Sequence, residues 1–188
     1  KDADATAKVT ERLAQACASA ETLLAAHPNV PDYAASYVGI CMRLAQLHGE
    51  AKRHAELEQV LRKAIPVQSA LARDFPDVAP YTFGRMMLRM SLAGVLRDQG
   101  ARPQLEEARA LYEAVISELS PAGEDVAERQ GHEQRFLRFS LGQAYADLGR
   151  VLSALGDEDG AAAARAKAEE LRGPERRRRG DRTEKDTP

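Results

Sequence analysis

The sequence contains few aromatic residues and no tryptophan. Aromatic residues make up 5% of the 188-residue chain, whereas alanine is its most frequent small residue. Alanine has a high helix propensity, and β-strands are enriched in aromatic and β-branched side chains. This composition argues against a β-sandwich. We predict an all-α protein with almost no strand.

The chain also lacks a long apolar run and a large net charge. No stretch approaches the roughly 18 or more apolar residues of a membrane span, and the N-terminus has no apolar signal core. The formal net charge of −2 is too small to attract nucleic acid or an anionic membrane through an overall field. We therefore expect a cytoplasmic protein with neither of those partners. Because the sequence begins at Lys1 without methionine, we expect it to be part of a longer protein.

Cysteine is scarce as well. Cys17 and Cys41 both lie in apolar stretches that are predicted to be helical, one on each side of a proline-containing segment. Neighbouring helices could bring the two thiols together, but small buried thiols are the more common role of cysteines at such positions. We expect two thiols rather than a disulfide.

Residue patterns typical of metal sites and catalytic groups are missing. Of the four histidines, His27, His48, His54 and His132, only His48 and His54 are close in the sequence. No cysteine or carboxylate completes a metal-ligand set at a known spacing. No Ser-His-Asp order and no special pair of carboxylates indicates catalysis. We expect a protein that is not an enzyme and that uses no metal and no cofactor.

One proline-containing segment occurs twice. HPNVPDY at 27–33 returns as FPDVAPY at 75–81, displaced by 48 residues at its Pro, Val and Tyr positions. The residue before each proline is expected to end a helix, because proline disfavours helical geometry in the residue before it. Asn29 and Asp77 have side-chain oxygens that can cap the next helix. We interpret each copy as a corner between two helices, packed by its tyrosine.

Apolar residues recurring at three- and four-residue steps predict seven helices. Their expected ranges are about 4–26, 31–48, 54–74, 79–98, 103–119, 125–155 and 158–172. Pro66 should kink or split the third helix. The fifth is expected to end at Ser120, Pro121 and Gly123, and the sixth to begin at a weaker copy of the corner segment, 123–129.

The seven helices and the 48-residue spacing predict a row of antiparallel hairpins stacked as a solenoid. The predicted helical domain covers residues 1–172, with units at about 4–26, 31–74, 79–120 and 125–172. Residues 173–188 are expected to be a disordered charged tail. A compact helical bundle is the alternative architecture, because antiparallel helices joined by short loops can also form bundles.

The last two predicted helices carry the most specific motif. Its residues are Tyr145, Leu148, Gly149, Leu152, Gly156, Ala161 and Ala168. This spacing of large and small residues resembles the tetratricopeptide-repeat signature. The small Gly149 and Ala161 are expected to let the two helices approach closely. The resemblance implies a right-handed superhelix in which the first helix of each hairpin lines a concave face. Arg165 departs from the family pattern, which has a large apolar residue there.

The corner segments are similar to those of a narrower group. Tetratricopeptide arrays that follow the catalytic domain of large bacterial serine/threonine protein kinases have related Pro-Asp-Val-Pro-x-Tyr corners. The matching residues are Phe75, Pro76, Asp77, Val78 and Tyr81, and Pro28, Asn29, Val30, Pro31 and Tyr33. Those arrays typically have an Asn-Leu-Gly segment in the first helix of each hairpin, and this chain has Arg43, Ser91 and Asp147 in place of that Asn. No kinase motif is present, so any kinase activity would lie outside this chain.

The resemblance suggests which residues contact a partner. The candidates on the concave face are Arg43, Arg85, Met86, Arg89, Arg135 and Arg138. Arginines with flexible methionines suit an acidic peptide that carries apolar anchors. The alternative is that the arginines are only the solvated face of amphipathic helices.

We therefore predict a protein-binding or scaffolding module, regulatory in a bacterial kinase, that holds a peptide or partner segment in a concave groove. A second hypothesis is a structural domain that forms a homo-oligomer when its terminal hairpins stack on another copy. An enzyme with an all-α active site is the third hypothesis.

Overall fold

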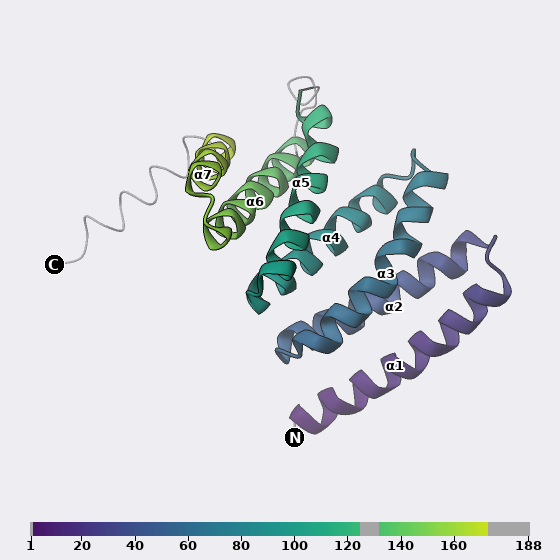
Figure 1. Cartoon of the computed structure of the whole chain (residues 1–188). Helices are drawn as coiled ribbons and strands as arrows, with labels where there is room; N and C mark the ends of the chain where they lie inside the picture. Colours follow the sequence, from purple (N-terminus) through teal and green to yellow (C-terminus); the bar gives the residue numbers. More distant parts are fainter. Residues whose placement is uncertain (1, 125–131, 173–188) are drawn as a thin grey trace. The chain divides into compact units, whose positions relative to one another are not determined.

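A computed structural model describes the backbone of residues 2–124 and 132–172 (Figure 1). These residues form seven helices and no strand. The helices are α1 (Asp2–Ala26), α2 (Pro31–Glu50), α3 (His54–Asp74), α4 (Ala79–Gln99), α5 (Arg102–Glu124), α6 (His132–Leu155) and α7 (Glu158–Arg172). The prediction of an all-α fold with about seven helices is confirmed.

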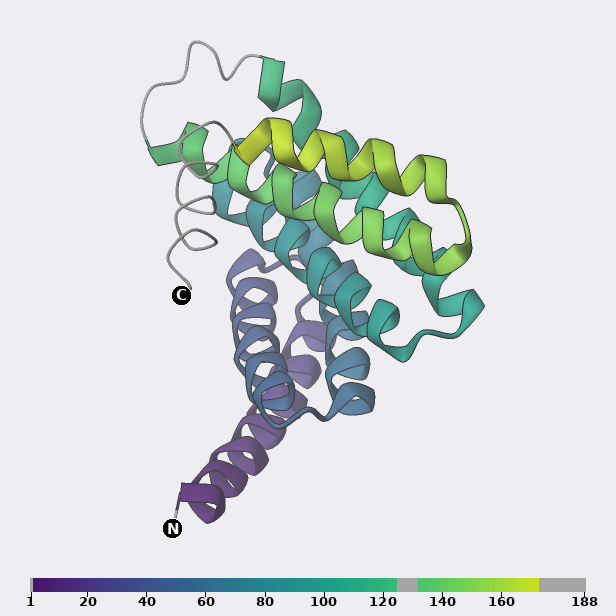
Figure 2. The same cartoon turned by 90° about the vertical axis from the view of Figure 1, so that its left-hand side faces the viewer.

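The chain divides into two compact units, Lys1–Val95 and Leu96–Pro188, with the boundary inside α4. In the first unit, α2 packs against both α1 and α3. In the second unit, α6 packs against both α5 and α7, and Figure 2 shows α6 and α7 side by side. Consecutive packed helices give each unit a helical-repeat-like architecture, as the predicted hairpins required. The finer division into four units stays a prediction.

The two copies of the corner segment adopt equivalent structures. His27 and Phe75 directly follow the ends of α1 and α3. In each copy the valine N–H donates to the carbonyl oxygen of that residue, at 3.2 Å in the first copy and 3.1 Å in the second. The tyrosine ring packs edge-on against the same residue, with ring centroids 5.7 Å apart for His27–Tyr33 and 6.0 Å apart for Phe75–Tyr81. The repeat in sequence is therefore a repeat in structure.

The start of α2 differs from its prediction in one respect. Val30 is the N-cap residue and no side chain caps the helix, so the predicted capping by Asn29 is wrong. Pro31 occupies the first turn of the helix. Proline has no N–H group, so the helix start has one donor fewer to satisfy without a side-chain cap.

Two prolines lie inside helices. α3 continues through Pro66, and Figure 1 shows its axis bending along its length, which agrees with the predicted kink. α5 continues past Pro121 to Glu124, so its predicted end at Ser120 is wrong. A proline in the last turn removes only the hydrogen bond of its own nitrogen, and the helix can continue around it. The predicted helix start at 125 and the tail at 173–188 lie outside the described residues.

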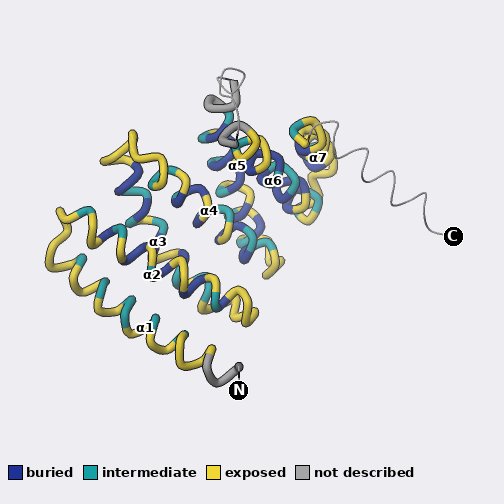
Figure 3. Tube along the Cα trace, turned by 180° about the vertical axis from the view of Figure 1, so that it is seen from behind, coloured by how far each residue is buried: buried dark blue, intermediate teal, exposed yellow. Residues whose placement is uncertain are grey.

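The core of each unit lies along its middle helix. In the first unit, Tyr37 and Cys41 of α2 are buried with Leu61 and Ala64 of α3. In contrast, no described side chain between residues 6 and 26 of α1 is buried, and Figure 3 shows these residues as exposed or half-buried. α1 therefore packs against the rest of the first unit through one side only.

In the second unit, small residues allow close packing of α6 and α7. A Cβ atom added to Gly149 would lie 3.3 Å from the backbone oxygen of Ala161 and 3.2 Å from Cγ of Arg165. Such distances are tighter than ordinary contacts, so a larger residue would push the two helices apart. The predicted role of Gly149 is confirmed, and Ala161 is fully buried on α7.

We expect Gly84→Ala to destabilise the first unit. A Cβ at Gly84 would lie 2.7 Å from Nε2 of Gln68, a buried side chain that donates to the Tyr81 carbonyl oxygen. Displacing this amide should lower the free energy of unfolding by about 1–2 kcal/mol. Gly39→Ala is the matched control, because Gly39 is exposed on α2 with no atom within 4 Å of an added Cβ. The control should stabilise by about 0.5–1 kcal/mol, and urea unfolding measures both changes.

Candidate functional site

The structure places the six predicted contact residues in both units, and four of them lie in the first. Arg43 is exposed on α2, and its guanidinium donates to Oε1 of Gln46 at 2.9 Å. Arg85 and Arg89 are half-buried on α4. Of the arginines predicted for this unit, Arg43 is exposed and the other two are half-buried.

Met86 is buried rather than available to a partner. It is 3% exposed, whereas Met87 is 37% exposed. Met86 lies seven residues before the buried Ala93, about two helical turns, and so shares its inward side of α4. The prediction that Met86 contacts a partner is wrong, and the exposed methionine of the pair is Met87.

The other two predicted residues lie near the start of α6, together with two exposed phenylalanines. Arg135 and Arg138 are exposed, and Phe136 and Phe139 are 39% and 60% exposed. Phe139 lies one helical turn after both Arg135 and Phe136. We call these four residues the α6 Arg-Phe face. Sequence reasoning selected its arginines but missed its phenylalanines, which the run RFLRF contains.

Within the α6 Arg-Phe face, Phe139 lies opposite the buried side of the helix, whereas Arg138 lies three turns before the buried Gly149 and on the same side as it. At about 100° per residue, Arg135 and Phe139 point away from the side that carries the buried residues. The buried apolar side chains on that side are Leu141, Ala144, Leu148, Val151 and Leu152. Arg150 follows Phe139 by three turns, and its side chain is 61% exposed. The open side of α6 therefore extends from Arg135 to Arg150, about 22 Å at about 1.5 Å per residue.

A buried carboxylate holds Arg150 in place. The Asp147 side chain is 10% exposed, and its Oδ1 accepts hydrogen bonds from Arg97 and Arg150, each at 2.5 Å. Its Oδ2 accepts from the Gln143 side chain at 2.7 Å. A buried charge needs such partners, because an unpaired one is strongly disfavoured. The network fixes the Arg150 guanidinium beside the open side of α6.

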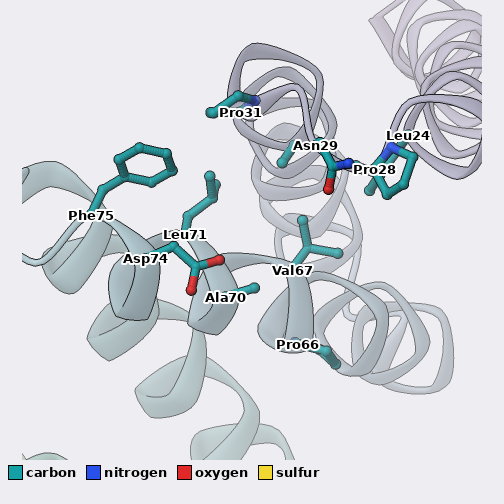
Figure 4. Close-up of a pocket in the computed structure, with 11 residues that line it drawn as sticks. Leu24, Pro28, Asn29, Pro31, Pro66, Val67, Ala70, Leu71, Asp74 and Phe75 are labelled. Carbon is teal, nitrogen blue, oxygen red and sulfur yellow. The ribbon is translucent and has the colours of Figure 1, made fainter.

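A pocket of about 470 Å³ lies in the first unit, next to the first corner segment (Figure 4). Its lining residues are Leu24, Pro28, Asn29, Pro31, Ala34, Pro66, Val67, Ala70, Leu71, Asp74 and Phe75. Asn29 and Asp74 supply the polar side chains of an otherwise apolar lining. The pocket can hold an apolar group, and its lining contains no nucleophile or acid–base pair for catalysis. The pocket was not predicted from the sequence. It forms only because the second half of α3 lies beside the first corner segment, and these segments are far apart in the sequence.

The two cysteines face each other across α1 and α2. Their Sγ atoms are 3.3 Å apart, and both residues are free thiols, as expected. Cys41 is buried and Cys17 is half-buried. Burial, and then the neighbouring Cys17, raise the pKa of the Cys41 thiol to about 12. Burial also raises the pKa of Tyr37, which lies beside Cys41.

His48 is a buried imidazole near the end of α2. Its Nδ1 atom is buried without a hydrogen-bond partner. Burial lowers the pKa of His48, although nearby Glu56 acts in the opposite direction. Within residues 2–124 and 132–172, no three His, Cys, Asp or Glu side chains are grouped so that they could hold a metal ion. His48 is 8% exposed and belongs to the core of the first unit.

Comparisons with known proteins give no family assignment. No family model matches the chain, and no curated protein matches it. The crystal structure of BtubC (BKLC) from P. vanneervenii aligns with 89% of this chain and 91% of its own, at 13% sequence identity and a TM-score of 0.31. None of the helices that the structure describes is long and apolar enough to cross a membrane.

We expect Asp147→Asn to destabilise the second unit by about 1–2 kcal/mol, because it removes the buried charge that pairs with Arg97 and leaves that partly buried guanidinium with Asp98 alone. Arg150→Ala should cost under about 1 kcal/mol, since the Arg150 side chain is mostly exposed. Urea unfolding of both variants measures the difference. Equal losses would contradict the proposed importance of the buried Arg97–Asp147 pair.

Stability should fall as the pH is lowered through the range in which His48 gains a proton. Because burial lowers its pKa, the unfolded chain binds that proton more readily, at a usual pKa of about 6.5. The free energy of unfolding should be highest above this value and fall below it, by at most about 1.4 kcal/mol per pH unit. Urea unfolding at about pH 7.5 and about pH 5.5 tests this.

His48→Gln should remove this extra pH dependence, whereas His54→Gln, at an exposed position, should retain it. The assignment to His48 fails if both variants keep the slope of the native chain.

Proposed function

We propose that this chain is a protein-binding or scaffolding module that binds an acidic peptide segment with apolar side chains. The observation that supports this most directly is the α6 Arg-Phe face. Tyr37 and Tyr112 are buried in the core, whereas Phe139 is 60% exposed, more than the exposed aromatic side chains elsewhere in the described residues, Tyr33, Phe75 and Phe83, at 37%, 38% and 40%. An exposed pair of phenylalanines between arginines is instead typical of a contact surface, since aromatic residues and arginine are enriched at interfaces.

The chemistry of this face specifies the partner. Phe139 gains free energy when an apolar side chain covers it, because apolar surface is removed from water. Arg135, Arg138 and Arg150 bind carboxylates through charged hydrogen bonds, and the planar guanidinium can contact both carboxylate oxygens. A partner with alternating acidic and apolar side chains satisfies both groups. Arg150 contributes with little ordering cost, because Asp147 already holds it.

The length of the open side of α6 sets the size of the partner segment. About 22 Å, from Arg135 to Arg150, matches six or seven extended residues at about 3.3–3.6 Å each. A helical partner would need about 15 residues for the same length. The proposed ligand is thus a short linear segment.

The finer identity rests on the sequence motifs. We propose a tetratricopeptide-like array in which α6 is the first helix of the last hairpin and faces the inner side of a right-handed superhelix. The corner segments support a regulatory role beside a bacterial serine/threonine kinase domain in the cytoplasm, through their resemblance to such arrays.

Self-association is the second candidate function, and α1 favours it. Val9 and Leu23 are 47% and 45% exposed on this helix, which packs by one side only. A second copy of the chain could cover that stripe. Light scattering over a range of concentrations distinguishes this candidate, because self-association through α1 requires a mass above that of the monomer. Leu23→Lys should then restore the monomer.

Selection of a random peptide display library on the immobilised chain tests the main proposal. We expect enrichment of short sequences that combine Asp or Glu with Leu, Ile or Phe. Phe139→Ala and Arg135→Glu should each weaken binding of a selected peptide about tenfold or more, equivalent to about 1.4 kcal/mol. Fluorescence anisotropy measures the dissociation constants, and binding should weaken as salt is added.

Two matched controls separate this surface from general effects of charge and apolarity. Arg165→Glu changes an exposed arginine on α7, and Met87→Ala removes an exposed apolar side chain on α4. Both should leave the affinity unchanged. Enrichment of basic peptides, or equal losses in the controls, would disprove the proposed surface. Binding to anionic vesicles with no peptide enrichment would instead assign the surface to lipid and overturn the proposal.

A further inference from the structure

The facing thiols of α1 and α2 have the arrangement of a redox modification site. We propose that Cys17 and Cys41 form a reversible disulfide when a small-molecule disulfide such as oxidised glutathione is present. Their Sγ atoms are 3.3 Å apart on neighbouring helices, and a disulfide bond is about 2.05 Å long. The sulfur atoms therefore need to approach by about 1.2 Å. This inference is independent of the proposed peptide binding.

The two thiols differ in access, which orders the reaction. Cys17 is half-buried, whereas Cys41 is buried, so the oxidant reaches Cys17 first. The Cys17 thiolate attacks one sulfur of oxidised glutathione, whose S–S bond breaks and releases one glutathione thiolate. The product is a mixed disulfide on Cys17. The thiol proton of Cys17 passes through solvent to the released glutathione.

The second step closes the protein disulfide. The Cys41 thiolate attacks Sγ of Cys17, the mixed disulfide breaks, and the second glutathione leaves with the proton that Cys41 lost. Two electrons have then moved from the two cysteines to oxidised glutathione, which becomes two glutathione molecules. Because burial disfavours the Cys41 thiolate, this step should be the slower one and should accelerate as the pH rises.

The disulfide would fasten the least buried helix of the first unit. No described side chain of α1 is buried, and its ion pair with α3, Glu21–Lys63 at 3.0 Å, is exposed and contributes little. A covalent link between α1 and α2 limits the separation of these helices by local unfolding. It also encloses the first corner, whose Pro28 and Pro31 line the pocket. Oxidation therefore stabilises one wall of that pocket.

Intact-mass measurement of the full chain after incubation with oxidised glutathione tests the proposal. The expected product has lost two hydrogen atoms and carries no glutathione, and dithiothreitol restores the original mass. Hydrogen exchange in α1 should slow about tenfold or more in the oxidised chain. An unmodified chain, stable glutathione adducts on both cysteines, or a disulfide-linked dimer would each overturn the proposal.

Two variants test the order of the steps. Cys41→Ala should stop at the mixed disulfide on Cys17, because the second thiol is absent. Cys17→Ser should resist oxidised glutathione, since the remaining thiol is buried. Rapid modification of Cys41 in this variant would refute the proposed order. Circular dichroism checks that both variants fold. The intact mass of the native chain tests disulfide formation itself and does not depend on either variant.

Discussion

Both units depend on one middle helix that is covered by apolar contacts on two sides. α2 packs between α1 and α3, and α6 packs between α5 and α7. Removing apolar surface from water on both sides determines how each middle helix is rotated, because only a narrow strip then remains exposed. That rotation turns Phe139 and Arg135 to the open side of α6. It also places Cys41 of α2 in the core.

The buried polar groups follow from the same packing. Asp147 and His48 lie on the middle helices, where two neighbours exclude water from them. Their outcomes differ because Asp147 is hydrogen-bonded to charged groups, whereas the buried Nδ1 of His48 has no hydrogen-bond partner. Asp147 is paired with Arg97 and Arg150, so the charge is retained. His48 has no such partner at Nδ1, and its neutral form is favoured. Burial thus produces an ion pair in one unit and a pH-sensitive core residue in the other.

The positions of the helices could be predicted from local rules. Whether an individual side chain on a helix is buried or exposed was harder to predict. The range of α7 was predicted at Glu158–Arg172, because an alanine-rich run has a strong helix propensity and lies between clear end signals. Met86 and Met87 are adjacent, so a small error in helix rotation exchanges the buried one for the exposed one. The exposed phenylalanines were missed because apolar residues are normally assigned to the core.

The all-α class, most helix ranges and the repeated corners could be predicted from the sequence, since these depend on contacts between residues that are close along the chain. Which residues from different helices meet depends on the tertiary packing. The 3.3 Å separation of Cys17 and Cys41, the ion pair of Arg97 with Asp147 and the pocket beside the first corner all join residues that are far apart in sequence. Such meetings depend on how two helices are rotated and spaced, which side-chain volumes decide together.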